Sequence, residues 1–92
     1  MAKSIIQTEK ECLICKTTIG LDKHHVFGAA NRRLSEKYGL TVFLCREHHT
    51  GNAGVHRNKI FNDRLKKVGQ KCFEKQCGTR EEFMRIFGRN YL

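Results

Sequence analysis

The chain has 92 residues, 39% of them hydrophobic, so it can bury only a small core, and we expect a single domain. No apolar run approaches the roughly 20 residues of a membrane span, and the start MAKSIIQTEK lacks a secretory signal, so we expect a soluble, cytoplasmic protein in a reducing compartment. Its 18 Lys and Arg against 9 Asp and Glu give a charge of +9, which favours a nucleic-acid partner over the alternative of a merely solvated basic surface.

The first half of the chain predicts an arm, two strands and one short helix. Residues 1–11 are almost entirely polar and predict an arm or a short edge segment. The mixed run IGLDKHHVF, residues 19–27, predicts a strand, and GAANRRLSEKYG, residues 28–39, predicts a loop and a short helix closed by its last glycine. LTVFLC, residues 40–45, is rich in β-branched and aromatic residues and predicts the clearest strand.

The second half of the chain predicts helices. REHHT, residues 46–50, predicts one helical turn, which the following glycines end. From Val55 to Gln76 apolar residues recur at three- to four-residue steps among basic ones, which predicts a helix with one packed and one basic face. Thr79 and Glu82 have capping-box spacing and predict a last helix. The apolar residues expected to pack are Ile60, Phe61, Leu65, Val68, Cys72, Phe73, Phe83, Met84, Ile86 and Phe87.

Two pairs of ligand-type residues have matching spacing. Cys12 and Cys15 form C-x2-C, Cys45 and His48 form C-x2-H, and 29 residues separate the pairs. Two intervening residues let one turn present both side chains to a common point, so the pairs predict a tetrahedral, structural zinc site. A redox dithiol is the alternative for C-x2-C, but it belongs in a βαβ context that this chain lacks. His49, in place of His48, is an open alternative for the fourth ligand.

The other histidines are His24, His25, His49 and His56. Because side chains on a helix advance by about 100° per residue, His49 cannot share the direction of His48 and faces a different site. The plain alternatives are that His24 and His25 are ordinary loop histidines and that His56 begins a helix. That every histidine falls near one of two candidate metals in a cationic chain favours a second metal site.

The order of these motifs resembles the HNH nucleases of the ββα-metal (His-Me finger) superfamily. The carrying features are C-x2-C, then HH after a strand, then a second strand that runs into C-x2-HH, all within residues 12–56. Residues 24–56 are further similar to small phage-encoded members, including recombination-enhancement nucleases. The resemblance implies a small α+β fold with an N-terminal arm (1–11), a zinc-braced ββα-metal core (12–56) and a helical C-terminal extension (57–92).

The resemblance also implies a metal-dependent endonuclease or nickase that hydrolyses phosphodiester bonds in DNA. His25 is then the general base, and His24, His49 and His56 hold a divalent cation, Mg²⁺ or another such as Mn²⁺ or Ni²⁺. The chemistry agrees, because imidazole has an unperturbed pKa of about 6.5 and accepts a proton near neutral pH. Basic residues expected to bind nucleic acid are Arg32, Arg33, Arg57, Lys59, Lys66 and Lys67.

Two features depart from the family pattern. The motif's middle Asn, which helps to orient the base, falls near Leu40 or Thr41, neither of which is Asn, and Asn31 or Asn52 is the candidate to replace it from a loop. The spacing to His56 is also stretched. Two other functions stay open: a non-catalytic zinc-finger module that binds nucleic acid through its basic helix, and an accessory subunit that acts with a recombinase or packaging protein in a phage-infected cell.

Overall fold

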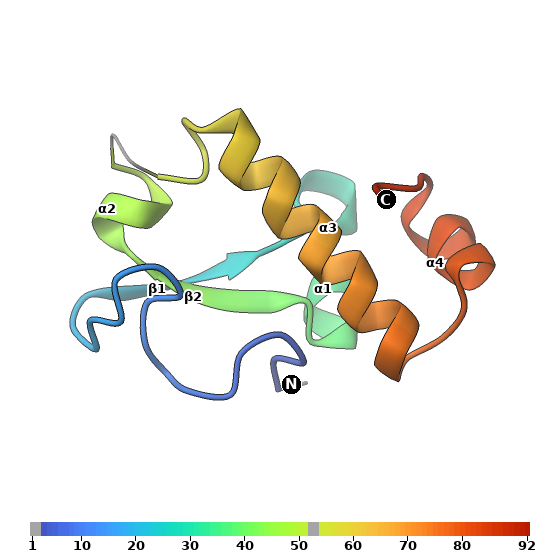
Figure 1. Cartoon of the computed structure of the whole chain (residues 1–92), viewed down its shortest axis with the longest axis horizontal. Helices are drawn as coiled ribbons and strands as arrows, with labels where there is room; N and C mark the ends of the chain where they lie inside the picture. The colour runs from blue at the N-terminus through green and yellow to red at the C-terminus, as the bar shows by residue number, and fades with distance from the viewer. Residues whose placement is uncertain (1–2, 52–53) are drawn as a thin grey trace.

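The computed structural model describes residues 3–51 and 54–92, which form a β-hairpin followed by helices (Figure 1). In chain order the elements are β1 (Leu21–His25), the 3-10 turn η1 (Ala29–Asn31), α1 (Arg32–Tyr38), β2 (Thr41–Cys45), α2 (Arg46–His49), α3 (Lys59–Gln76) and α4 (Arg80–Phe87). The strands pair antiparallel, with Leu21 opposite Cys45 and His25 opposite Thr41. The predicted α+β class is therefore confirmed. Within the described residues, no helix has both the length and the apolar character to cross a bilayer.

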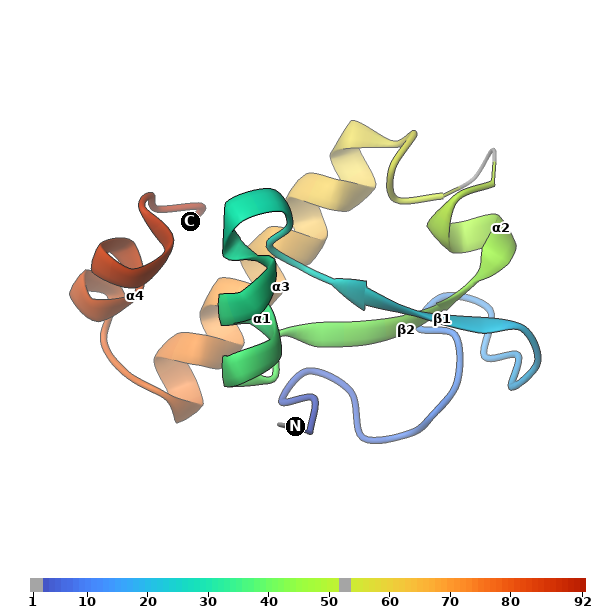
Figure 2. The same cartoon turned by 180° about the vertical axis from the view of Figure 1, so that it is seen from behind.

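The long helix α3 crosses the hairpin and links the two ends of the molecule. α2 lies at one end and α4 at the other, beside α1, and the same arrangement is visible from behind (Figures 1 and 2). The start of α3, the C-terminal end of β1 and the helical turn α2 therefore surround one region, which contains the candidate site.

The helix between the strands, α1, ends at Gly39 as the sequence predicts. Gly39 has a φ of 72°, a left-handed conformation that glycine adopts without strain, and a Cβ there would collide with the carbonyl oxygen of Lys3. Its N–H points to the carbonyl groups of Ser35 and Glu36, which closes the helix. The chain then enters β2 through the fully buried Leu40.

The N-terminal arm, residues 3–11, lies beside β2 rather than free in solvent (Figure 2). The N–H of Ile5 donates to the carbonyl oxygen of Gly39 over 2.9 Å. The side-chain oxygen of Gln7 accepts from the N–H of Phe43 over 2.8 Å. The segment is thus neither a free arm nor an edge strand, because scattered hydrogen bonds hold it beside β2 without forming a strand.

A cluster of aromatic rings joins the hairpin to the helical extension. Phe27, just after β1, lies 5.4 Å from Phe83 and 5.0 Å from Phe87, and Phe73 of α3 lies 5.3 Å from Phe83, between ring centroids. A Cβ at Gly69 would lie 3.1 Å from the Phe27 ring, so glycine here lets α3 approach closely. The buried hydrophobic residues are Cys12, Val26, Phe27, Leu40, Val42, Leu44, Val55, Leu65, Phe73, Phe83 and Phe87, which form one continuous core.

The predicted start of α3 at Val55 is wrong. The helix begins at Lys59, and the side-chain oxygen of Asn58 caps it by accepting from the N–H of Phe61 over 3.0 Å. Val55 is buried instead, and its N–H donates to the carbonyl oxygen of His48. This segment returns the chain from α2, a tertiary role that the helical periodicity could not reveal.

Three of the apolar residues expected to pack are exposed, which corrects the predicted packed faces. Ile60, Val68 and Met84 are 67%, 44% and 42% exposed. The buried arc of α3 is narrow, because it runs through positions four residues apart, from Leu65 to Phe73. Residues off that arc face solvent although they continue the apolar pattern.

The capping box that opens α4 is confirmed. The N–H of Glu82 donates to the Thr79 hydroxyl over 3.1 Å, and the N–H of Thr79 donates to the Glu82 carboxylate over 3.0 Å. These reciprocal bonds satisfy backbone donors that a helix start leaves unpaired. The helix is thereby aimed so that Phe83 and Phe87 are buried.

Candidate metal centres

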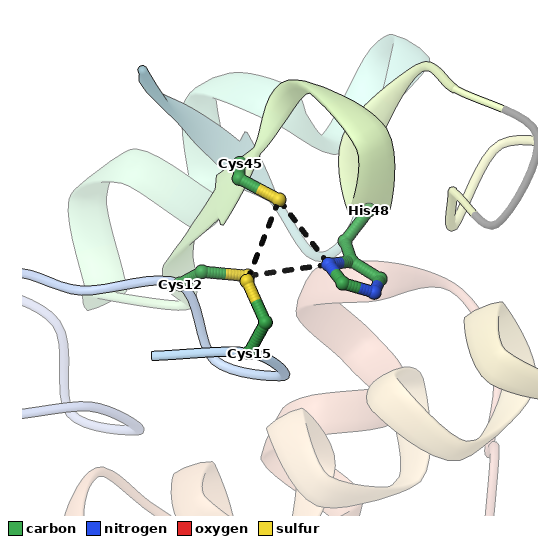
Figure 3. Close-up of side chains that lie close together, drawn as sticks. All are labelled: Cys12, Cys15, Cys45 and His48. Carbon is green, nitrogen blue, oxygen red and sulfur yellow. Dashed lines mark hydrogen bonds between the residues drawn. The ribbon is translucent and has the colours of Figure 1, made fainter. Parts of the chain in front are cut away.

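The two predicted pairs of ligand-type residues meet at one point. Cys12 and Cys15 come from the loop before β1, Cys45 from the end of β2 and His48 from α2, and the four side chains converge in Figure 3. Their ligand atoms all lie within 4.8 Å of one another. His49 is not part of this cluster, so the alternative in which it replaces His48 is excluded by position.

The distances in this cluster fit a tetrahedral zinc shell. The Sγ of Cys45 lies 3.2 Å from His48 Nδ1, the Sγ of Cys12 lies 3.6 Å from the same nitrogen, and the sulfurs of Cys15 and Cys45 are 3.7 Å apart. With Zn–S near 2.3 Å and Zn–N near 2.0 Å, the edges of a tetrahedron are about 3.5–3.8 Å. The group therefore suggests a structural Zn²⁺, as predicted.

Backbone bonds fold the loop that carries the first two cysteines. The N–H of Lys16 donates to the carbonyl oxygen of Cys12 over 3.0 Å, and the N–H of Cys12 donates to Thr17 over 2.8 Å. Leu13 donates to the carbonyl oxygen of Phe43 in β2 over 2.9 Å, which ties the loop to the strand that ends in the third cysteine. The knuckle is thus held in place by the hairpin itself.

The charges in the sulfur cluster favour a cation. Burial raises the pKa of the Cys12 thiol, but backbone hydrogen bonds from Cys15, Cys45 and Ile14 outweigh it and lower that pKa to about 6. At Cys15 a backbone hydrogen bond from Thr17 lowers the pKa, yet burial and the neighbouring sulfurs raise it overall. A Cys12 thiolate at neutral pH therefore disfavours a second thiolate at Cys15, and a bound cation relieves this repulsion.

A second cluster contains three histidines from three parts of the chain. His24 of β1, His49 of α2 and His56, which follows α2 in the chain, have ligand nitrogens within 4.8 Å of one another. The Nε2 atoms of His49 and His56 are 3.2 Å apart. Because consecutive side chains on a helix point in directions about 100° apart, His48 and His49 of α2 reach different clusters, as helical geometry predicts.

A sharp return of the chain after α2 brings in His56. α2 ends at His49, and a Cβ on Gly54 would lie 2.6 Å from the His49 carbonyl oxygen, so only glycine fits there. The N–H of Val55 then donates to the carbonyl oxygen of His48. The expected looped return, rather than a continuous helix, is thus what places His56 beside His49.

The donor set of the histidine cluster suits a divalent cation. His24 is only 6% exposed, and its Nε2 has no hydrogen-bond partner among the described residues. A buried, unpaired nitrogen is costly unless a ligand satisfies it. The Nδ1 of His49 lies 3.2 Å from the Asp22 carboxylate, which leaves its Nε2 directed at His56, as in metal-ligating histidines held by a carboxylate.

The low pKa of His24 gives a testable pH dependence. Burial, with the charges of His49, His56, His25 and Lys66, lowers this pKa to about 4. The unfolded chain therefore binds a proton near pH 6.5, where the folded chain does not, so the stabilising contribution of the neutral ring is complete above 6.5 and is lost as pH falls toward 4.

In protein freed of metal at the histidine cluster, we expect the Cε1 resonance of His24 to stay unchanged in NMR spectra from pH 8 to 5.5. In urea-unfolded chain the same resonance should titrate near 6.5. A midpoint near 6.5 in the folded protein would contradict the buried, neutral ring.

His25 projects from the other face of β1, because neighbouring residues of a strand alternate. Its Nε2 lies 2.9 Å from the carboxylate of Glu36 in α1, and the same carboxylate bonds to Lys23 over 2.8 Å. Sequence reasoning missed Glu36. The only signal for it is that Lys23 and His25, two residues apart, share a strand face that a following helix could cover.

The three clustered histidines and His25 line one cavity of about 560 Å³. Two of the predicted nucleic-acid residues, Arg32 and Lys66, also line it, together with Asn62 and Tyr91, which the sequence did not indicate. The cavity wall is thus both histidine-rich and cationic.

The other basic residues predicted to bind nucleic acid do not line this cavity. Arg33 lines a second cavity beside α1 that shares Lys23, His25 and Arg32 with the first. Arg57, Lys59 and Lys67 are exposed and outside the lining of both cavities, and Lys59 pairs with Asp63 over 2.7 Å.

In the described part of the chain, the side chain that bonds to the His25 ring is Glu36 rather than an asparagine. Leu40 and Thr41 are buried, and Thr41 lies opposite His25 in the strand register. The side-chain amide of Asn31 lines the cavity but donates to the carbonyl oxygen of Phe87 over 3.0 Å. Asn52 lies outside the described residues.

Comparisons of the chain with protein-family models, curated proteins and solved structures give no match. What stands is a small ββα arrangement with a Cys3His group and a histidine triad, both of which could bind metal. Any function for this site therefore follows from its geometry and chemistry.

Proposed function

We propose that the protein is a metal-dependent, HNH-type endonuclease or nickase that hydrolyses phosphodiester bonds in DNA. One observation carries the proposal: histidines from β1, α2 and the following loop converge in a cationic cavity that a fourth histidine, His25, also lines. The ligand set of His24, His49 and His56 binds a divalent cation, and the Cys3His group binds a structural zinc ion that braces α2.

His25 is the group that takes the proton. A water molecule in the cavity gives a proton to the imidazole, and the hydroxyl oxygen bonds to phosphorus. The bond from phosphorus to the leaving oxygen breaks, and that oxygen takes a proton from solvent. When bound, a divalent cation supplies positive charge against the growing charge on the phosphoryl oxygens.

The basic side chains hold the substrate. Arg32 and Lys66 line the same cavity as the histidines, so they contact phosphates next to the scissile bond. Arg33 extends this surface beside α1, and Arg57, Lys59 and Lys67 add long-range attraction for a polyanion. Imidazole ligands favour Mn²⁺, Ni²⁺ or Zn²⁺ over Mg²⁺, which prefers oxygen, so a bound Mg²⁺ would need further oxygen ligands from the substrate or water.

The test is nicking of supercoiled plasmid by purified protein in Mg²⁺, Mn²⁺ or Ni²⁺. We expect open-circular product in at least one metal and none in EDTA. His56→Ala, purified in the same way, is the control for contaminating nuclease. Removing a residue that merely orients a metal ligand already lowers activity about 10- to 100-fold, so loss of the ligand His56 should lower the nicking rate by at least that factor.

Two other outcomes would contradict the proposed nuclease function. DNA binding without cleavage in all three metals would assign a non-catalytic zinc-finger module. Cleavage that appears only on adding a recombinase or packaging protein would assign an accessory subunit.

A further inference from the structure

The carboxylate of Glu36 contacts two side chains of β1. One oxygen, Oε2, lies 2.9 Å from His25 Nε2, and the other, Oε1, lies 2.8 Å from Lys23 Nζ. Lys23 and His25 are two residues apart on the strand, so both project toward α1. Each carboxylate oxygen therefore binds one donor.

These contacts determine which nitrogen of His25 carries the proton. Hydrogen bonds from Lys23, and then from His25, lower the pKa of Glu36, so the carboxylate is ionised at neutral pH and can only accept. A neutral His25 therefore donates from Nε2. Its lone pair is then on Nδ1, which makes no hydrogen bond to the described part of the chain.

The position of Glu36 is fixed by its neighbour in α1. Ser35 is fully buried, and its hydroxyl accepts from the N–H of Phe27 over 3.0 Å and donates to the Phe27 carbonyl oxygen over 2.7 Å. The N–H of Leu40 donates to the Ser35 carbonyl oxygen over 2.8 Å. α1 is thus bound to the backbone just after β1 and just before β2, which positions Glu36 beside His25.

Solvent does not screen this pair strongly. The side chains of His25 and Glu36 are 15% and 26% exposed, so the hydrogen bond lies in a partly dry setting, where charge-assisted bonds are stronger. The carboxylate also offsets the positive charge that the ring gains with a second proton. This is the arrangement of a base held by an acceptor.

We propose that Glu36 is a positioning residue: it holds His25 through Nε2 and presents Nδ1 as the nitrogen that accepts the proton of the attacking water. The inference rests on the proposed nuclease function and deepens it. It also accounts for the missing Asn at residues 40 and 41, because orientation comes from α1 instead of from the start of β2.

The first test needs no variant. Long-range ¹H–¹⁵N NMR of zinc-loaded wild-type protein at neutral pH should show His25 as the Nε2–H tautomer. A ring that carries its proton on Nδ1, or that mixes both tautomers, would overturn the inference whatever the activity.

The second test compares variants in the nicking assay. Glu36→Leu keeps a similar volume but removes the acceptor, and we expect kcat to fall about 10- to 100-fold with KM changed less than a few-fold. Glu36→Gln keeps one amide oxygen as acceptor and should recover part of the loss. The matched control is Glu81→Leu, which removes an exposed carboxylate at the start of α4 and should leave kcat unchanged.

The outcomes separate the two proposals. Inactive wild-type protein overturns the nuclease and, with it, the role of Glu36. Active wild-type protein with an equally active Glu36→Leu variant overturns the role of Glu36 alone. If Glu36→Leu does not fold, the tautomer of His25 in wild type and the kcat of Glu36→Gln decide. A Glu36→Gln variant that is fully active although its His25 ring mixes both tautomers would contradict the positioning role.

Discussion

Replacing His25 with alanine is expected to lower the nicking rate by about 10²- to 10⁴-fold, the usual contribution of a general base. The fold should survive, because His25 lies outside the hydrophobic core and its ring bonds to the partly exposed Glu36. The Cys3His group and the three clustered histidines are left complete. Nicking rates in the best metal, the melting temperature and DNA affinity by fluorescence anisotropy measure the three effects.

A matched variant separates chemistry from binding. Lys67 lies on the exposed face of α3 and outside both cavities. Lys67→Ala should weaken DNA binding, with a smaller salt dependence, and leave the rate at saturating DNA unchanged. His25→Ala should lower the rate at saturating DNA and leave DNA binding unchanged. Nicking by His25→Ala within a few-fold of wild type would rule out His25 as the base.

The sequence predicted the two strands and the ligand-rich turn because local rules act there. Strand alternation and the helical advance of 100° per residue determine which way Cys45, His48 and His49 point once β2 and α2 form. The spacing therefore predicted the Cys3His group and turned His49 away from it, whereas the family resemblance supplied His24 and His56 as the partners of His49. The structure brings both groups together.

Local rules could not find residues that only tertiary packing brings in. Glu36 reaches His25 because Ser35 anchors α1 across the strand ends, and Tyr91 reaches the cavity because the aromatic cluster docks α4. The prediction for Val68 was wrong in the opposite sense, because this residue was expected to pack and is exposed. Periodicity cannot tell how wide a stripe of the helix the hairpin will cover. Contacts between elements, rather than patterns within them, decided these positions.

Zinc loss is expected to have the largest effect on stability. Structural zinc contributes about 10–16 kcal/mol of apparent binding energy in zinc-finger peptides, whereas whole domains are stable by only about 5–15 kcal/mol. We expect one zinc ion at the Cys3His group, and we expect Cys15→Ser to lose it. Because 1 kcal/mol shifts the melting temperature of a small domain by about 4–8 °C, the variant should melt more than about 10 °C below wild type.

Cys15 suits this test because its side chain is exposed, so serine removes a ligand without opening a cavity in the core. Cys77, exposed at the end of α3 and outside the cluster, provides the matched control, and Cys77→Ser should melt like wild type. Since His48 and His49 are neighbours on one turn, losing zinc should also displace His49 and abolish nicking. A Cys15→Ser variant that melts and nicks like Cys77→Ser would show that the sulfur cluster neither braces α2 nor supports the second site.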